Sequence, residues 1–136
     1  MRNLGELRSR APHGVLLALL VGLMARLARW LCCVRVVEID GAWYARLAER
    51  LSDGAYEGLV PGPEVMFPPL YPAGIAALAA TGLDPVTAGR LLSLAGGLAV
   101  IVLGWRLARR LGGDRAATAT AWFLALAPAQ IASSVA

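Results

Sequence analysis

The sequence has few charged residues, no lysine and only two cysteines. Charged residues make up 16% of the 136-residue chain, whereas a soluble domain carries about 25%. Hydrophobic residues make up 58%. This composition excludes an ordinary soluble domain and predicts a membrane protein, with the lipid bilayer as its main partner.

The scarcity of cysteine and histidine argues against a disulfide or a metal site. Cys32 and Cys33 are adjacent, so they cannot readily bridge each other. They lie in an apolar run, and no histidine or further cysteine stands near them at metal-ligand spacing. We therefore expect both to be small, buried, apolar residues.

The 13 basic residues are all arginines, and the net charge is +4. They form no patch interleaved with aromatic side chains, so the sequence does not predict nucleic-acid binding. Several arginines lie inside or beside apolar runs instead. Membrane topology explains the distribution of the arginines better than nucleic-acid binding does.

Three apolar segments are long enough to cross a membrane, namely residues 15–37, 86–107 and 116–136. At about 1.5 Å per residue, each covers a hydrocarbon core about 30 Å thick. No clean small-x-small site follows the first segment, which favours an uncleaved span over a signal peptide. The third reaches the chain end without flanking charges, which favours a truncated chain.

Two of these segments contain residues that are unusual in a membrane. Arg26 and Arg29 lie about one turn apart in the first segment and share a helix face. We expect them to point into a helix bundle or to extend towards the headgroups. Pro128 should kink the third helix, which neighbouring membrane helices tolerate.

The polar segment 38–85 separates the first two spans. Residues 42–51 have apolar and charged faces at helical spacing, with Asp40 before them and Gly54 after them as end signals. A second helix, at 68–82, opens on two prolines. Both helices are too short to cross a membrane, so we expect them to lie at its surface.

Charge asymmetry predicts the orientation of these segments. The tail 1–14 has three arginines and one acid, residues 106–115 have four arginines and one acid, and residues 38–84 have two arginines and seven acids. Basic loops stay cytoplasmic. The tail and the predicted loop 108–115 should therefore face the cytoplasm of a bacterial-type plasma membrane, and segment 38–85 should lie outside. The predicted fold class is all-α and multi-pass, with three spans and two interfacial helices.

The order of the motifs resembles the N-terminal part of GT-C-type glycosyltransferases, in the group of protein O-mannosyltransferases and lipid A aminoarabinose transferases. The resemblance covers about residues 15–136. It depends, after the first span, on Asp40-Gly41-Ala42-Trp43-Tyr44-Ala45-Arg46-Leu47-Ala48-Glu49, Asp53-Gly54, Pro68-Pro69-Leu70-Tyr71-Pro72 and Arg90. Such enzymes usually have many more membrane helices, so the chain would be a fragment of a larger GT-C fold.

The resemblance implies inverting transfer of a sugar from a polyprenyl-phosphate donor. The acceptor would be a hydroxyl group of a lipid, glycan or protein at the outer face of the membrane. Asp40 matches the essential acid of the first external loop, which activates the acceptor or helps to hold a metal in the family. Many relatives have Glu directly after this Asp, but this chain has Gly41. The second acid is therefore missing or replaced by Glu38, which leaves a divalent metal as an open question.

The chemistry of the residues agrees with these roles and also allows simpler ones. A carboxylate such as Asp40 can accept the proton of an acceptor hydroxyl, and it can also cap the helix that follows. Glu38 is a candidate substrate ligand or a solvated charge. Tyr44 and Tyr71 can stack on a sugar or anchor the chain at the interface. Arg90 can bind a donor phosphate or fix the topology.

Two other classes of protein remain as alternatives. A small scaffold or accessory subunit needs only packing faces, and Gly96, Gly97 and Gly104 would support close helix contacts. A transporter or channel fragment should have broken helices and polar residues at mid-membrane, whereas the polar residues here gather at one surface. Neither alternative explains the motifs of the loop, so a glycosyltransferase is the preferred prediction.

Overall fold

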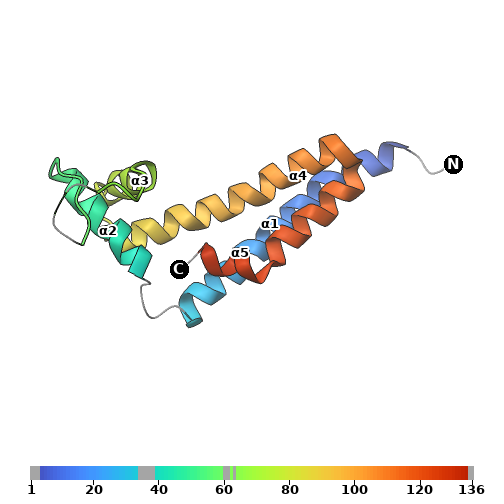
Figure 1. Ribbon diagram of the computed structural model, residues 1–136. Coiled ribbons are helices and arrows are strands. Elements are labelled where there is room, and N and C mark those ends of the chain that lie inside the picture. Colours follow the sequence, from blue (N-terminus) through green and yellow to red (C-terminus); the bar gives the residue numbers. More distant parts are fainter. Residues whose placement is uncertain (1–3, 34–38, 60–61, 63, 135–136) are drawn as a thin grey trace. The chain divides into compact units, whose positions relative to one another are not determined.

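The computed structural model describes residues 4–33, 39–59, 62 and 64–134. Within these residues all regular structure is helical and no strand occurs, which confirms the all-α prediction. The helices are α1 (Leu4–Cys33), α2 (Ile39–Ser52), α3 (Leu70–Ala79), α4 (Pro85–Leu126) and α5 (Pro128–Ser133), shown in Figure 1.

The helices belong to two compact units that divide between Ser93 and Leu94. The first unit contains α1, α5 and α4 from Leu94 onward. The second contains α2, α3 and the first turns of α4. We describe each unit by itself.

Two helices in the described part of the chain are long and apolar enough to cross a membrane. They are the segment His13–Cys32 of α1, with 20 residues, and α4, with 42 residues. Each contains an 18-residue window with a mean hydropathy of 1.9. By length and composition, both are candidate membrane-spanning helices.

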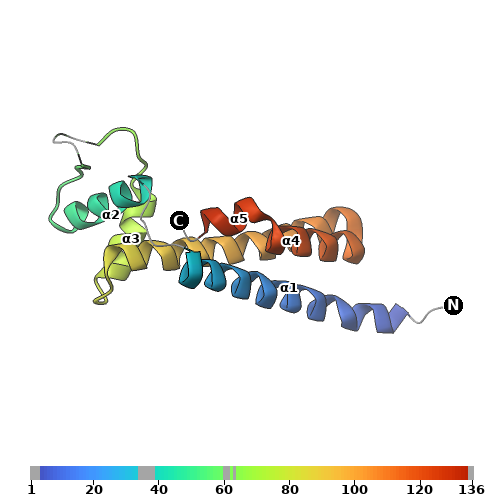
Figure 2. The same cartoon turned by 90° about the horizontal axis from the view of Figure 1, so that it is seen from below.

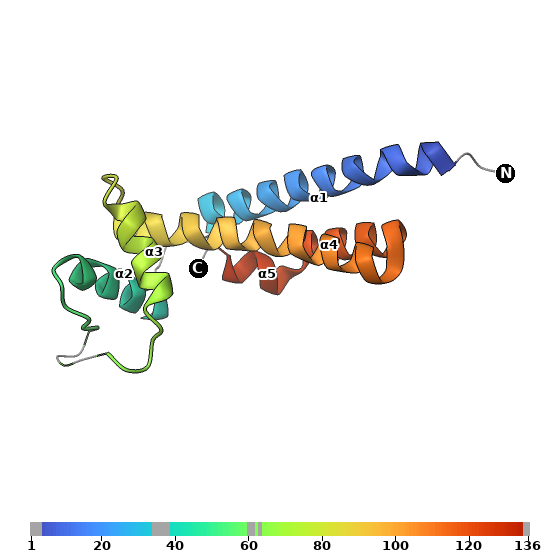
Figure 3. The ribbon, with the colours of Figure 1, turned by 90° about the horizontal axis from the view of Figure 1, so that it is seen from above.

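Helical residues occupy most of the predicted loop 108–115, and the helix is interrupted within this range at Gly113. This residue has φ 75° and ψ −172°, whereas its neighbours are helical. Glycine adopts a positive φ without the steric penalty of a Cβ atom, so one residue is enough to reverse the chain. Figures 1 and 3 show the second limb of α4 (residues 114–126) running back beside the first.

Small residues let the helices of the first unit approach closely. A Cβ atom added at Gly104 would lie 2.4 Å from Leu124 Cδ1, and one added at Gly22 would lie 3.0 Å from Ile101 Cδ1. The buried core around these contacts is also built of small and aliphatic side chains. Its members are Val15, Ala18, Ile101, Ala121 and Ala125.

The third predicted span, 116–136, is divided at Ala127. This residue is extended, with φ −60° and ψ 118°, and α5 begins at the next residue, Pro128. Proline has no backbone N–H group, so it cannot donate to the carbonyl of Leu124 four residues earlier. The break therefore leaves the last carbonyl groups of α4 without the donors of a continuing helix.

Arg26 binds these carbonyl groups from α1. Its side chain is fully buried, at 0% exposure. It donates from Nη1 to Gly22 O (3.0 Å) and Ala125 O (3.2 Å), and from Nη2 to Leu124 O (3.5 Å). Of the two alternatives that the sequence leaves open for Arg26, the structure shows the side chain pointing into the packed helices and not extending away from them. Pro128 removes a backbone donor at the end of α4, and Arg26 supplies side-chain donors to the carbonyl groups there. The two residues therefore belong to the same helix break.

The helix α2 extends beyond the predicted range 42–51 at both ends. Asp40 therefore lies in its first turn rather than before it, where a negative charge is favoured by the helix dipole. The predicted C-terminal signal is confirmed, because Gly54 has φ 80°. Ala55 N donates to Arg50 O (2.9 Å) and Gly54 N to Leu51 O (3.1 Å), the paired bonds of a Schellman motif.

The helix α3 is shorter than the predicted 68–82. It begins at Leu70, directly after Pro69, because a proline disfavours the helical conformation of the residue before it, here Pro68. It ends at Ala79, and Gly82 follows with φ 94°. Figure 2 shows α2 and α3 side by side, and the core between them and the start of α4 contains the buried residues Ala48, Ile75 and Ala88.

The start of α4 has a capping arrangement. Asp84 Oδ2 accepts from Thr87 N at 2.9 Å, and Pro85 occupies the first helical position, where its missing N–H costs nothing. The hydrogen bonds from Thr87, its backbone N–H first, lower the pKa of Asp84. The predicted external segment therefore ends in a defined helix start.

One expectation about the cysteines is wrong. Cys32 is exposed and not buried. It lies near the end of α1, in the last turn of the helix, where no described helix covers it. The side chain of Cys33 lies outside the described residues.

Candidate functional site

The candidate site is in the second unit, at the start of α2. Asp40 is exposed in the first turn, and its carboxylate has no hydrogen-bond partner among the described residues. Tyr44 follows one turn later on the same face of the helix. An exposed carboxylate is free to accept a proton from a bound hydroxyl group, so the geometry is compatible with the predicted role of Asp40.

Glu38, the second acid proposed as a substrate ligand, lies outside the described residues. Among the residues that are described, no three His, Cys, Asp or Glu side chains come together in a way that could hold a metal ion. The described part of the chain thus offers one carboxylate at this position and no set of metal ligands. We derive no step that uses a metal.

Tyr44 and Tyr71 come together, although they belong to different helices. Their rings are 4.9 Å apart between centroids, at an interplanar angle of 80°. Phe67 lies against Tyr44 at 5.1 Å and 77°, and against Trp43 at 5.7 Å. We call these four residues the aromatic cluster. Edge-to-face contacts of this kind stabilise a fold by about 0.5–1.5 kcal/mol beyond area burial.

The hydroxyl group of Tyr71 is already engaged. It donates to Gly89 O at 3.1 Å and lies 2.6 Å from Ser93 Oγ, where either oxygen can donate. These bonds attach α3 to the first turns of α4. Tyr71 therefore has a structural role in addition to any contact with a sugar, and Tyr44 has the less constrained hydroxyl group of the two.

Arg90 lies beside this attachment point, between Gly89 and Ser93 on α4. It is half-buried, and its Nε is buried without a hydrogen-bond partner in the described structure. Its positive charge contributes to the lowered pKa of Asp84. Because Nε is enclosed by the fold, an anion could reach this half-buried guanidinium only through its Nη groups.

Glu64 has a structural role that no pattern in the sequence indicates. Its Oε2 accepts from Trp43 Nε1 at 2.7 Å. Its Oε1 accepts from the backbone N–H groups of Met66 at 2.7 Å and Phe67 at 3.3 Å. These bonds, Met66 first, hold the pKa of the Glu64 carboxyl below its ordinary value of 4.5. Glu64 thus attaches the loop between α2 and α3 to α2.

The same loop is closed by Tyr56. Its carbonyl accepts from Glu64 N at 2.9 Å, and its hydroxyl donates to Phe67 O at 2.7 Å. Burial, followed by the charge of Glu64, raises the pKa of Tyr56. Gly58 lies so close to the indole of Trp43 that a Cβ atom would be 2.3 Å from Nε1. No spacing in the sequence indicates these contacts, because they depend on how the loop folds back.

The chain matches no protein-family model, no curated protein and no solved structure. The function therefore has to be inferred from the chemistry and placement of its own residues.

Proposed function

We propose that the chain is part of a membrane glycosyltransferase that uses a polyprenyl-phosphate-linked sugar. In this proposal α1 and the two limbs of α4, the second continued by α5, make three crossings. The second unit lies at the outer surface of a bacterial-type plasma membrane. The charge asymmetry supports this orientation, because the reversal at Gly113 is flanked by arginines while the α2–α3 segment is acidic.

The observation that supports this function best is the exposed carboxylate of Asp40 one turn before the aromatic cluster. Aromatic side chains are suited to lie against sugar rings, and a neighbouring carboxylate can act on a hydroxyl group. The rest of the unit supplies rigidity through the Schellman motif, the Glu64 bonds and the Tyr71 bonds. A catalytic group on a rigid element can be held in a defined position.

The proposed reaction needs only one protein carboxylate. The acceptor oxygen attacks the anomeric carbon of the donor and forms a new glycosidic bond, while the bond from that carbon to the phosphate oxygen breaks. The hydroxyl proton passes to Asp40, and the polyprenyl phosphate leaves with its negative charge. Attack opposite to the leaving group inverts the anomeric configuration. Gly41, where many enzymes of the GT-C group that the motifs resemble have a second acid, agrees with a mechanism that uses Asp40 alone.

The test is a sugar-transfer assay with membranes that contain the full-length protein and a panel of radiolabelled polyprenyl-phosphate hexoses. We expect Asp40→Asn to abolish transfer without changing the amount of protein inserted in the membrane. Asp53→Asn is the matched control, since Asp53 is exposed near the other end of α2. Near-wild-type transfer by Asp40→Asn would remove this residue from the mechanism.

A scaffold or accessory subunit is the second candidate, and the packing of the first unit favours it. Gly22, Gly97 and Gly104 allow close contacts, and Arg26 joins two helices without any group available for chemistry. A scaffold would support a partner enzyme equally well with Asp or with Asn at position 40. Failure of the wild-type protein to transfer any sugar of the panel would favour this function.

A further inference from the structure

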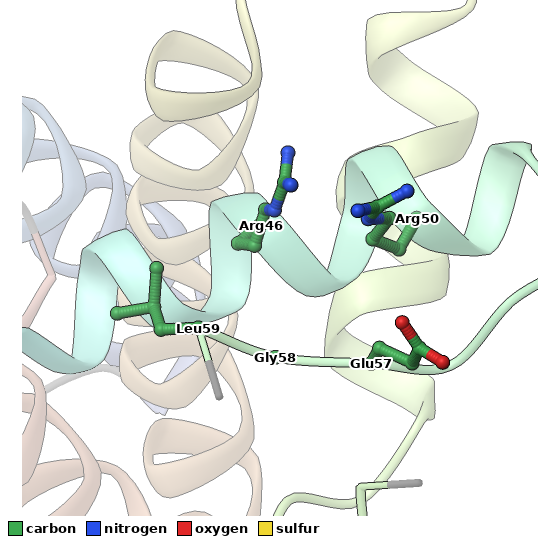
Figure 4. Close-up of a pocket in the computed structure, with 5 residues that line it drawn as sticks. All are labelled: Arg46, Arg50, Glu57, Gly58 and Leu59. Carbon is green, nitrogen blue, oxygen red and sulfur yellow. The ribbon is translucent and has the colours of Figure 1, made fainter. Parts of the chain in front are cut away.

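The second unit has a cavity that the proposed reaction does not use. It has a volume of about 520 Å³ and is lined by Arg46 and Arg50 of α2 and by Glu57, Gly58 and Leu59 of the loop. Figure 4 shows both arginine side chains on one side of α2 and Glu57 on the loop segment that passes the helix. Its volume is within the range of about 300–1,000 Å³ that is usual for small-molecule sites.

The charge of this cavity is unusual for the segment in which it lies. Segment 38–84 has seven acids and two arginines, and the two arginines are Arg46 and Arg50. Both line the same cavity, four residues apart on one helix face, so their Cβ atoms are about 5–6 Å apart. The only basic side chains of an acidic segment are thus concentrated at one place.

Neither arginine is neutralised in a way that would prevent it from binding an anion. Arg46 pairs with Glu49 at 3.2 Å, but both side chains are about half exposed, at 40% and 49%. An exposed pair of this kind contributes little and exchanges readily. Arg50 and Glu57 line the cavity together but form no ion pair among the described residues.

We propose that this cavity binds a phosphate ester that carries free hydroxyl groups. Guanidinium groups match the geometry of phosphate oxygens and bind them through charge-assisted hydrogen bonds. Glu57 accepts hydrogen bonds and donates none when it is ionised, so it selects a ligand with hydroxyl donors. The two arginines favour a ligand with an anionic phosphate, and Glu57 favours hydroxyl groups on the same ligand. This inference does not depend on the proposed glycosyltransferase activity.

The test is titration calorimetry of the full chain in a non-ionic detergent. Three probes separate the parts of the proposal: dihexanoyl-phosphatidylglycerol has phosphate and hydroxyl groups, dihexanoyl-phosphatidic acid has phosphate alone, and glycerol 3-phosphate is a soluble ester. We expect the double variant Arg46→Gln/Arg50→Gln to raise the Kd for phosphatidylglycerol by about tenfold or more, because charge-assisted bonds are lost. We expect Glu57→Gln to reduce the preference for phosphatidylglycerol over phosphatidic acid.

The matched control is Arg110→Gln/Arg115→Gln, which removes the same charge from exposed residues of the first unit. An unchanged Kd in Arg46→Gln/Arg50→Gln, or an equal loss in the control, would overturn the proposal. Circular dichroism verifies that each variant keeps its helices. If glycerol 3-phosphate binds as tightly as the lipid, the natural ligand is soluble, and if it binds about tenfold more weakly, the ligand is a lipid headgroup. Either result supports the phosphate site.

Discussion

Replacement of Arg26 should be most harmful when Pro128 is present. Arg26 donates to the carbonyl groups of Leu124 and Ala125, which lie where the break at Ala127 removes the usual helical donors. The variant Arg26→Met keeps an unbranched apolar side chain about as long as the aliphatic part of arginine and removes every donor. Pro128→Ala restores a backbone N–H at the position that would bind Leu124 O in a continuous helix. The two changes should therefore be coupled.

The magnitude follows from the two interhelical bonds. A hydrogen bond to a charged group contributes about 1.5–3 kcal/mol in proteins, while interhelical bonds in a membrane protein average about 0.6 and reach about 1.7 kcal/mol. One of the two bonds is well formed at 3.2 Å and the other is long at 3.5 Å. We therefore expect a coupling of about 1–2 kcal/mol in the free energy of unfolding.

The double-mutant cycle is preferable to the single variant, because removal of a buried cation also relieves a desolvation cost that opposes the loss of its bonds. Unfolding free energies would be measured in mixed micelles for the wild type, the two single variants and the double variant. Arg29→Met is the control, since Arg29 Nε is buried but has no hydrogen-bond partner among the described residues. Additivity of Arg26→Met and Pro128→Ala within about 0.5 kcal/mol would refute the coupling.

Two further predictions concern packing and pH. Gly97→Ala should destabilise the first unit by about 1–3 kcal/mol, because its Cβ would lie 2.8 Å from Ser134 Cβ. At Gly96 an added Cβ would have no atom within 4 Å, so Gly96→Ala should be neutral or stabilising. If the two alanine variants changed the free energy of unfolding in micelles equally, this packing would be contradicted. The second unit should be stable above the ordinary pKa of a glutamate, 4.5, and lose stability as the pH falls through the lowered pKa of Glu64. Glu64→Gln should flatten the acid side of a thermal-unfolding pH series, and an unchanged slope would exclude Glu64 as its cause.

The sequence predicted those features that depend on local backbone chemistry. The helical signals around α2 and the left-handed glycine at its end were visible, because a Schellman motif needs only a glycine after an amphipathic stretch. The burial of Arg26 was one of two predicted alternatives, the other being extension of the side chain towards the headgroups, and the structure decides between them.

Other features were not predictable, because tertiary contacts decide them. The charged stretch around Arg109 looked like a loop, but the helix continues there, and Arg109 bonds to Asp114 at 2.8 Å across the reversal. No pattern in the sequence relates Glu64 to Trp43, but the fold of the loop brings the two side chains together. Both side chains bind partners whose proximity arises only after the chain has reversed direction. A pattern along the sequence does not contain that information.

Arg26 of the first unit and the two arginines of α2 lie in opposite environments, and this difference separates structure from function. Arg26 is buried, and backbone carbonyl groups of its own unit accept three hydrogen bonds from it. Arg46 and Arg50 line an open cavity, and Arg50 has no ion pair in the described structure. Arg26 uses its Nη groups within its own fold and so stabilises that fold, although its buried Nε has no partner among the described residues. A cation that is left available can bind a ligand instead. Arg46 and Arg50 of α2 are therefore better candidates for recognition than Arg26 in the helix bundle.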